Sequence, residues 1–286
     1  NYIKINEAAW VIPNSDSQSL ILGRKKFLWS ELDEEWALGA IEPVFKWNPL
    51  KRESQGLVGL FWVAQTPLFQ FASFISPVSL PDQGPRYDVN GQGQFGKKNP
   101  WFQTPPKTFQ PFPGSETSSN ISYDIQKPPE SDIILQSSLG GTFEGTIEKI
   151  FLWRVGYFYK PMNELALGYN GIYNTGTNTG EVEILPQLVY TRVTTADMIF
   201  SFDTIRTGFS ILRDQPEKVD FATEWTAPVL SPSFVYSAFV EFKFDHSQLL
   251  KFDYLTIDGG RVQEIGDLAS ADRAPITSRY PFTQAY

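Results

Sequence analysis

The feature that most constrains the fold is the regular alternation of aromatic with small, polar or charged side chains over residues 149–173. The alternation pauses at Lys160-Pro161-Met162-Asn163 and resumes at Leu165. A period of two places successive side chains on opposite sides of a sheet, and Pro and Asn favour a tight turn. The pattern therefore predicts a β-hairpin. One face of its first strand carries Phe151, Trp153, Val155, Tyr157 and Tyr159.

The same alternation recurs along the chain. Residues 1–29 read as a hairpin, and residues 233–245 form a second clear strand that is followed by another. Residues 56–75 carry no charge, so a transmembrane helix is an alternative there. Pro67 and the two glycines disfavour a helix, and we predict two strands that turn at 65–67. The fold class is therefore all-β.

Three long segments interrupt the strands, at about residues 30–55, 77–131 and 214–230. The second of these is rich in proline, and so long a loop needs a reason in a compact domain. Outer-membrane barrels supply one, because they carry long loops on one side. We predict a single domain, 1–286, that forms a transmembrane antiparallel β-barrel with long Pro-rich loops. Pro281 interrupts the last candidate strand, so we expect the barrel to be incomplete at its termini.

Composition excludes several classes of function. The chain has no cysteine, which rules out disulfides and thiolate metal sites, and its net charge of −8 without a basic run argues against nucleic acid as a partner. The only histidine, His246, lies in a short predicted turn, where a solvated role is expected. Because hydrolytic chemistry usually needs a histidine base, we predict no catalytic site, and we also predict no metal and no cofactor.

An acidic cluster begins the first long segment. Its members are Glu31, Asp33, Glu34 and Glu35. Their spacing does not match an EF-hand loop, so a calcium site is a weak interpretation. The plain interpretation is a solvated loop, and the alternative is a loop folded into a barrel lumen.

Isolated charges of both signs lie opposite the apolar faces. In a barrel they would face a wet lumen, whereas a soluble sandwich would show them to solvent on its outside. The predicted lumen-facing residues are Arg24, Lys26, Arg154, Glu164, Glu183, Glu241, Lys243, Lys251 and Asp253. We expect Arg154 to oppose Glu164, Glu241 to accompany Lys243, and Lys251 to accompany Asp253.

A family resemblance points the same way. Gly23-Arg24-Lys25 followed by Trp29, Asp33, Gly39 and Pro43 resembles proteobacterial outer-membrane porin-like barrels, in which such a strand ends in Trp and enters a loop with Asp, Gly and Pro. Residues 76–85 also resemble their long extracellular loop. The resemblance covers residues 6–85 and implies a barrel in the Gram-negative outer membrane.

The predicted function is passive diffusion of small solutes or ions through a porin-like channel, because rings of charged side chains set pore selectivity. The predicted surroundings are outer-membrane lipid and lipopolysaccharide, with a protein partner or a homo-oligomer as a further expectation. One alternative is a closed scaffold barrel whose loops dock a partner protein. A less favoured alternative is a soluble carbohydrate-binding protein that uses Trp36, Trp47 and Trp101 as stacking platforms.

Overall fold

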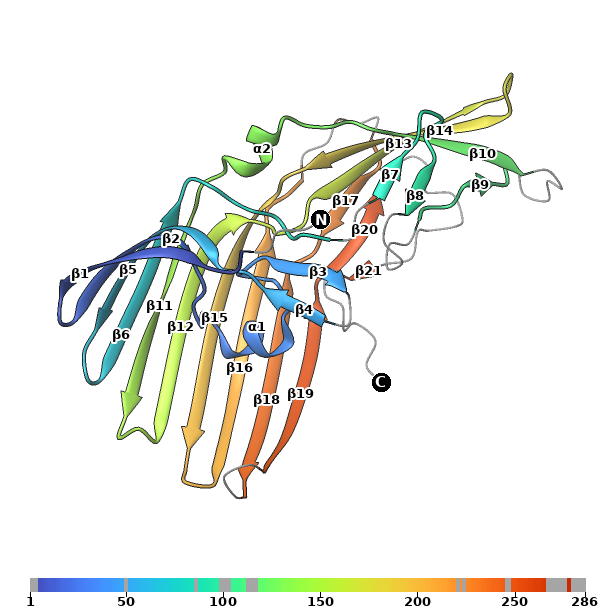
Figure 1. Cartoon of the computed structure of the whole chain (residues 1–286). Helices are drawn as coiled ribbons and strands as arrows, with labels where there is room; N and C mark the ends of the chain where they lie inside the picture. Colours follow the sequence, from blue (N-terminus) through green and yellow to red (C-terminus); the bar gives the residue numbers. More distant parts are fainter. Residues whose placement is uncertain are drawn as a thin grey trace.

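The computed structural model describes residues 5–48, 51–84, 87–97, 104–111, 118–219, 222, 225–244, 248–265 and 277–278. The predicted fold class is confirmed at the level of all-β structure, with strands throughout and two short helices, α1 (Glu31–Trp36) and α2 (Glu130–Ile134). The predicted turn at His246 and the stacking residue Trp101 lie outside the described residues. Figure 1 shows one large curved sheet with smaller sheets at one end.

The large sheet has ten strands, each antiparallel to its neighbours. In spatial order they are β1 (Ala8–Ser15), β2 (Gln18–Lys25), β5 (Leu57–Gln65), β6 (Phe69–Ser76), β11 (Ser138–Ile147), β12 (Phe151–Pro161), β15 (Tyr190–Ser201), β16 (Ile205–Pro216), β18 (Ser233–Lys243) and β19 (Leu249–Gly259). The strand pairs predicted in residues 1–29, in residues 56–75 and from residue 233 onward are thus confirmed.

The two faces of this sheet differ in an unusual way. The face that turns away from the rest of the chain, here the outer face, exposes large apolar side chains. Among them are Leu22, Leu60, Trp62, Phe69, Ile75, Leu139, Phe143, Val155, Tyr157, Met198, Phe200, Phe209, Phe252 and Tyr254. The concave inner face instead buries charged and hydroxyl side chains next to a compact apolar cluster. Alternation along each strand produces this division, because neighbouring residues point to opposite faces.

The predicted closed barrel is not what the structure shows. The ten strands form an open sheet with β1 at one edge and β19 at the other, and no described strand joins the two edges. The sheet is nevertheless strongly curved, and α1 with its neighbouring strands lies over the concave side (Figure 1).

The predicted hairpin over residues 149–173 is wrong. Both strands exist, but β12 pairs with β11 and β15 in the large sheet, whereas β13 (Ala166–Asn174) pairs with β14 (Thr179–Gln187) in another sheet. The chain leaves the large sheet at the 161–164 turn, where the Asn163 side chain donates to the carbonyl of Gly39 at 2.6 Å. Alternation reports which face a residue occupies, and it carries no information about which strand is the partner.

The predicted long loops contain regular structure. Residues 77–131 hold β7 (Tyr87–Val89), β8 (Phe95–Lys97), β9 (Thr108–Phe109) and β10 (Ser119–Ile125), and residues 214–230 hold the end of β16 and β17 (Ala227–Leu230). Strands β9, β10, β13 and β14 make a four-stranded sheet in which β10 and β14 are parallel. Strands β17, β20 (Arg261–Ile265) and β21 (Thr277–Ser278) make a third sheet, and β7 pairs with β8.

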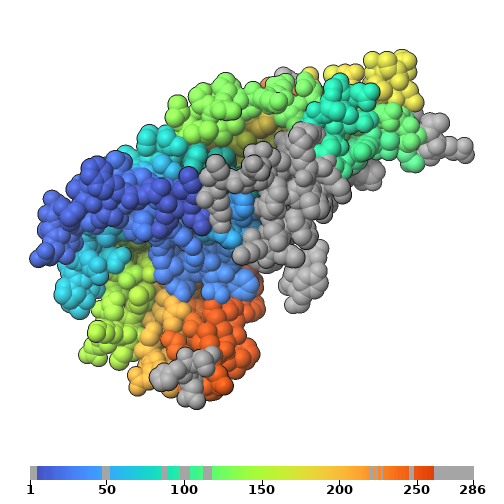
Figure 2. Space-filling model, viewed as in Figure 1, coloured from blue at the N-terminus to red at the C-terminus, as the bar shows by residue number. Residues whose placement is uncertain are grey.

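Residues 30–55 are also more than a solvated loop. They form α1, β3 (Val44–Asn48) and β4 (Lys51–Ser54), and together with the residues just before them they cover the inner face of the large sheet. Residues 26–54 are called the inner segment below. In Figure 2 the mid-blue atoms of this segment lie between the dark blue strands β1 and β2 and the orange strands near the other edge of the sheet.

Candidate functional site: the inner face of the large sheet and the inner segment

A row of polar side chains crosses the inner face at one level of the sheet. The strand registers place Glu144 opposite Arg154, Arg154 opposite Asp197, and Asp197 opposite Ser210. The guanidinium of Arg154 donates to Glu144 at 2.6 and 2.9 Å and to Asp197 at 3.4 Å. Arg154 and Asp197 are 5% and 1% exposed, so this ion pair network is buried. Such pairs are retained only when each charge keeps a partner, and here each does.

A second charged group lies nearer the β19 edge. Arg206 on β16 contacts Glu31 of α1 and donates to Glu241 on β18 at 2.7 Å. Lys251 on β19 lies 2.5 Å from Glu35 of α1 and 3.2 Å from Asp253. Each cation therefore has one carboxylate from the sheet and one from the helix.

One aromatic ring supports both of these cations. The Phe239 ring centroid lies 4.8 Å from the Arg206 guanidinium carbon and 5.6 Å from the Lys251 ammonium nitrogen. Phe239 is itself buried on the inner face. Cations within about 6 Å of a ring face are attracted by its quadrupole, so Phe239 helps to hold both cations in position beneath α1.

Helix α1 rests on the polar row through its two ends. The Ser30 hydroxyl and the Glu31 backbone N–H both donate to the Asp197 carboxylate, at 3.4 and 3.2 Å. At the other end the Trp36 indole N–H donates to the Ser237 hydroxyl at 3.0 Å. Two members of the acidic cluster, Glu31 and Glu35, are thus bound to the inner face.

The preceding residues are held by aromatic packing instead. Trp29 is 2% exposed, and its ring lies 5.4 Å from Phe158, 5.5 Å from Phe74 and 6.4 Å from Phe61. These three phenylalanines come from β12, β6 and β5, so Trp29 joins strands that are far apart in sequence. Aromatic side chains bury large areas, and this cluster is the main apolar contact of the inner segment.

Buried carboxylates fix the turn that follows α1. Glu42 accepts from the Phe27 backbone N–H at 3.0 Å and from the Trp29 indole at 3.2 Å. Burial raises the pKa of Glu42 to about 8, against the effect of the Phe27 hydrogen bond. Burial also raises the pKa of Asp33, whose carboxylate accepts from the backbone N–H groups of Ala40 and Ile41. Both side chains therefore hold the residues before α1 and after α1 in place through hydrogen bonds within the inner segment.

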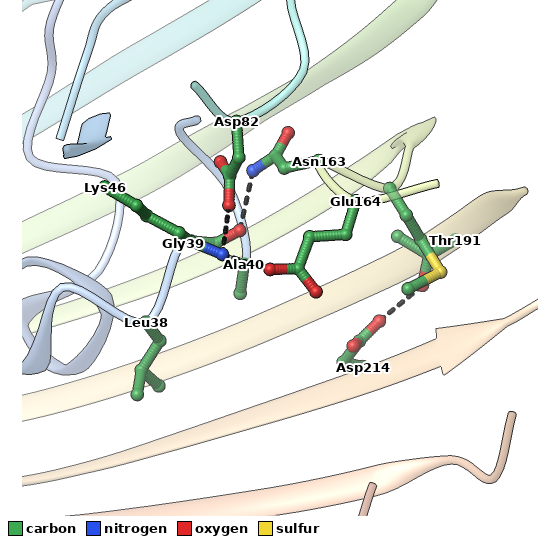
Figure 3. Close-up of a pocket in the computed structure, with 10 residues that line it drawn as sticks. Leu38, Gly39, Ala40, Lys46, Asp82, Asn163, Glu164, Thr191 and Asp214 are labelled. Atoms are coloured by element: carbon green, nitrogen blue, oxygen red, sulfur yellow. Dashed lines mark hydrogen bonds and ion pairs between the residues drawn. The ribbon is translucent and has the colours of Figure 1, made fainter. Parts of the chain in front are cut away.

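A small polar cavity of about 40 Å³ lies where β3 meets the loops at the end of the sheet (Figure 3). Lys46 lies 2.6 Å from Asp82 and also contacts Glu164. Burial raises the pKa of Asp82, partly offset by Lys46. The cavity has room for only a few water molecules, so we interpret it as a joint between the inner segment and two loops.

The structure distributes the predicted lumen residues over several places. Arg154, Glu241, Lys251 and Asp253 lie on the inner face, where Lys251 is beside Asp253 as expected. Glu241 and Lys243 share one face of β18, as expected, but Glu241 pairs with Arg206 and Lys243 is exposed at the end of the strand. Arg154 does not oppose Glu164 and instead pairs with Glu144 and Asp197.

The remaining predicted residues lie away from this row. Arg24 donates to the carbonyl of Gly56 and the side chain of Gln55, and Lys26 contacts Glu34 of α1. Glu164 lies in the turn before β13, beside Lys46. Glu183 lies on β14 of the four-stranded sheet and so is not part of the large sheet.

Sequence reasoning missed Glu144, Asp197 and Arg206 as site residues, and it named Glu31 only as part of the acidic cluster. Thr191, Val193, Thr195 and Asp197 lie on one buried face of β15. Following that alternation through residue 197 would have found Asp197.

Comparison with known proteins identifies no relative: no family model, no curated protein and no solved structure matches the chain. Within the described ranges, neither helix is long and apolar enough to cross a membrane, and no group of three or more His, Asp or Glu side chains is placed to bind a metal ion.

Proposed function

We propose that the large sheet is the wall of an outer-membrane β-barrel whose outer face meets lipid and whose inner face lines the lumen. The observation that carries this proposal is the division of the two faces. The outer face exposes tryptophan, phenylalanine and leucine across the strands, while Arg154, Asp197 and Glu241 are buried on the inner face. Apolar surface of this extent marks a contact with lipid or protein, and transmembrane barrels alternate apolar-out with polar-in.

A membrane location requires that the edges of the sheet be paired. Unpaired backbone N–H and C=O groups cost several kcal/mol each in hydrocarbon, so open edges do not face lipid. Because the ten strands alternate in direction, β1 and β19 run in opposite directions and suit antiparallel closure of the wall. The resemblance to porin-like barrels stays a prediction that agrees with this proposal.

The lumen of this barrel is closed at rest. The inner segment lies over the inner face and occupies the charged positions that a solute would pass, including Arg206 and Lys251. A freely open porin does not fit this arrangement. The function we propose is therefore a channel for small solutes or ions that the inner segment plugs.

A second candidate is a closed scaffold barrel that docks a partner. It is favoured by the aromatic packing of Trp29, which is typical of a permanent core, and by the four-stranded sheet that extends from one end of the wall (Figure 1). In this case the inner segment never leaves, and the extended sheet presents the docking surface.

Conductance in planar bilayers separates these functions. We would compare the wild type with a variant whose residues Glu31–Trp36 are replaced by a Gly/Ser linker of equal length, after showing by heat-modifiable migration that both are folded. We expect discrete steps from the linker variant and few from the wild type. Silence from both folded proteins would favour the scaffold. Equal conductance would show that the inner segment is no plug, and a protein that stays in water without detergent would refute the membrane location.

A further inference from the structure

We propose that α1 is a detachable gate, held to the wall by an electrostatic latch, while the aromatic contacts of Trp29 stay in place as its anchor. The inference rests on the proposed role of the inner segment as a plug and names the part of it that moves. The latch consists of Glu31 with Arg206, and Glu35 with Lys251.

The contacts of the two parts differ in kind. The latch pairs are partly exposed: the side chains of Glu31 and Arg206 are 15% and 28% exposed, and those of Glu35 and Lys251 are 41% and 22% exposed. Partly exposed ion pairs contribute little each and weaken as salt shortens the screening length from about 10 Å at 0.1 M to 3 Å at 1 M. The aromatic contacts of Trp29 carry no charge, so salt should not loosen them.

The charged side chains of the wall keep other partners when α1 leaves. Arg206 keeps Glu241, Lys251 keeps Asp253, and both keep their contact with Phe239. Asp197, which accepts from the start of the helix, keeps its ion pair with Arg154. Detachment therefore strands no buried charge on the wall, which is the usual obstacle to opening such a contact.

The contact between α1 and the inner face is also imperfect. One carboxylate oxygen of Glu31, Oε2, is buried without a hydrogen-bond partner among the described residues. A buried unsatisfied oxygen costs free energy in the seated state that is recovered when water reaches it. The apolar contacts that α1 gives up are those of Leu32, which is 1% exposed, and of Trp36, which packs against the buried cluster and also loses its hydrogen bond to Ser237. The closed state is therefore favoured, but the difference in free energy between it and the open state is small.

Thiol labelling measures detachment directly, because the chain has no cysteine of its own. Leu32→Cys places a thiol under α1, and Val44→Cys places a matched, fully buried thiol on β3, outside the latch. A small, neutral, water-soluble thiol reagent would be applied to each folded protein in detergent micelles at 0.1 M and 1 M NaCl. The reagent is neutral so that salt acts on the latch and not on the reagent.

We expect the labelling rate of Cys at position 32 to rise about tenfold between 0.1 M and 1 M NaCl, as two partly exposed ion pairs are screened. The rate at position 44 should stay constant. Adding Glu31→Gln and Glu35→Gln should raise the rate at position 32 about tenfold at 0.1 M and remove its salt dependence. Glu130→Gln with Glu148→Gln, two exposed carboxylates outside the inner segment, should change neither.

Equal, salt-independent rates at positions 32 and 44 would overturn the latch, as would a salt response at both, which would mean general loosening. Labelling does not depend on conductance. A latch that opens without current would therefore refute the channel and leave the gate standing, whereas current with a protected position 32 would refute the gate alone.

Discussion

Protonation of Glu42 should control the stability of the inner segment. Its carboxyl group is 3% exposed and lies between the Phe27 N–H and the Trp29 indole. Burial raises its pKa from 4.5 to about 8, and the nearby carboxylate of Asp33 adds to the rise. Lys26 lowers it by a smaller amount, and Glu34 raises it slightly.

The sign of the pH effect follows from this direction. The folded-state pKa lies above the unfolded value, so the contribution of Glu42 to stability is fully present below pH 4.5 and is lost as the pH rises through about 8. A rise of this size corresponds to roughly 5 kcal/mol at about 1.36 kcal/mol per pKa unit, which is an upper bound. Burial raises the pKa of Asp33 as well, so its contribution to stability is also lost as the pH rises.

Urea unfolding in detergent micelles from pH 5 to pH 9 tests this reasoning. Glu42→Gln mimics the protonated carboxyl group, so its free energy of unfolding should be within about 1 kcal/mol of the wild type at pH 5. At pH 9 the variant should be several kcal/mol more stable than the wild type. Glu130→Gln, an exposed carboxylate on α2, should follow the wild-type curve. Parallel pH profiles for wild type and Glu42→Gln would refute a buried, neutral Glu42.

Three further predictions concern the wall, each measured by urea unfolding. Arg154→Ala leaves the carboxylates of Glu144 and Asp197 without their cation and should cost about 3–5 kcal/mol in micelles; a loss below 1 kcal/mol would mean that water already screens this network. Phe158→Ala removes a fully buried ring from beneath Trp29 and should cost about 3–5 kcal/mol, and an effect no larger than that of Tyr157→Ala on the outer face would contradict the assigned core. Phe209→Arg places a charge on the outer face and should cost about 2–4 kcal/mol in liposomes, whereas Lys243→Arg should be neutral; no cost at residue 209 would place that face in water.

The sequence carried much of the local structure of the wall. Alternation identified β5, β6, β12, β18 and β19, because a strand with one apolar face has a period that no helix shares. The same signal could not assign partners. β12 and β13 are neighbours in sequence and alternate equally well, yet they belong to different sheets.

The site was less accessible to sequence reasoning for a physical reason. Four carboxylates in six residues look like a solvated face, and nothing local shows that Arg206 and Lys251 lie opposite them. Those contacts join residues that are more than 170 positions apart and exist only because the sheet curves around α1. The burial of Asp33 and Glu42 likewise depends on the folded structure, so it could not be predicted from the composition of the segment.

The most direct test of the membrane wall is to measure whether each of its faces contacts lipid or water in a bilayer. Single cysteines at residues 207–212 of β16 would carry spin labels in liposomes, and collision rates with oxygen and with a water-soluble nickel complex would be compared. We predict that labels at Thr207, Phe209 and Ile211 collide mainly with oxygen, as in lipid, and that labels at Gly208, Ser210 and Leu212, which are buried on the inner face, are protected from both reagents. Preferential collision of the first three with the nickel complex would place the outer face in water and contradict the membrane wall.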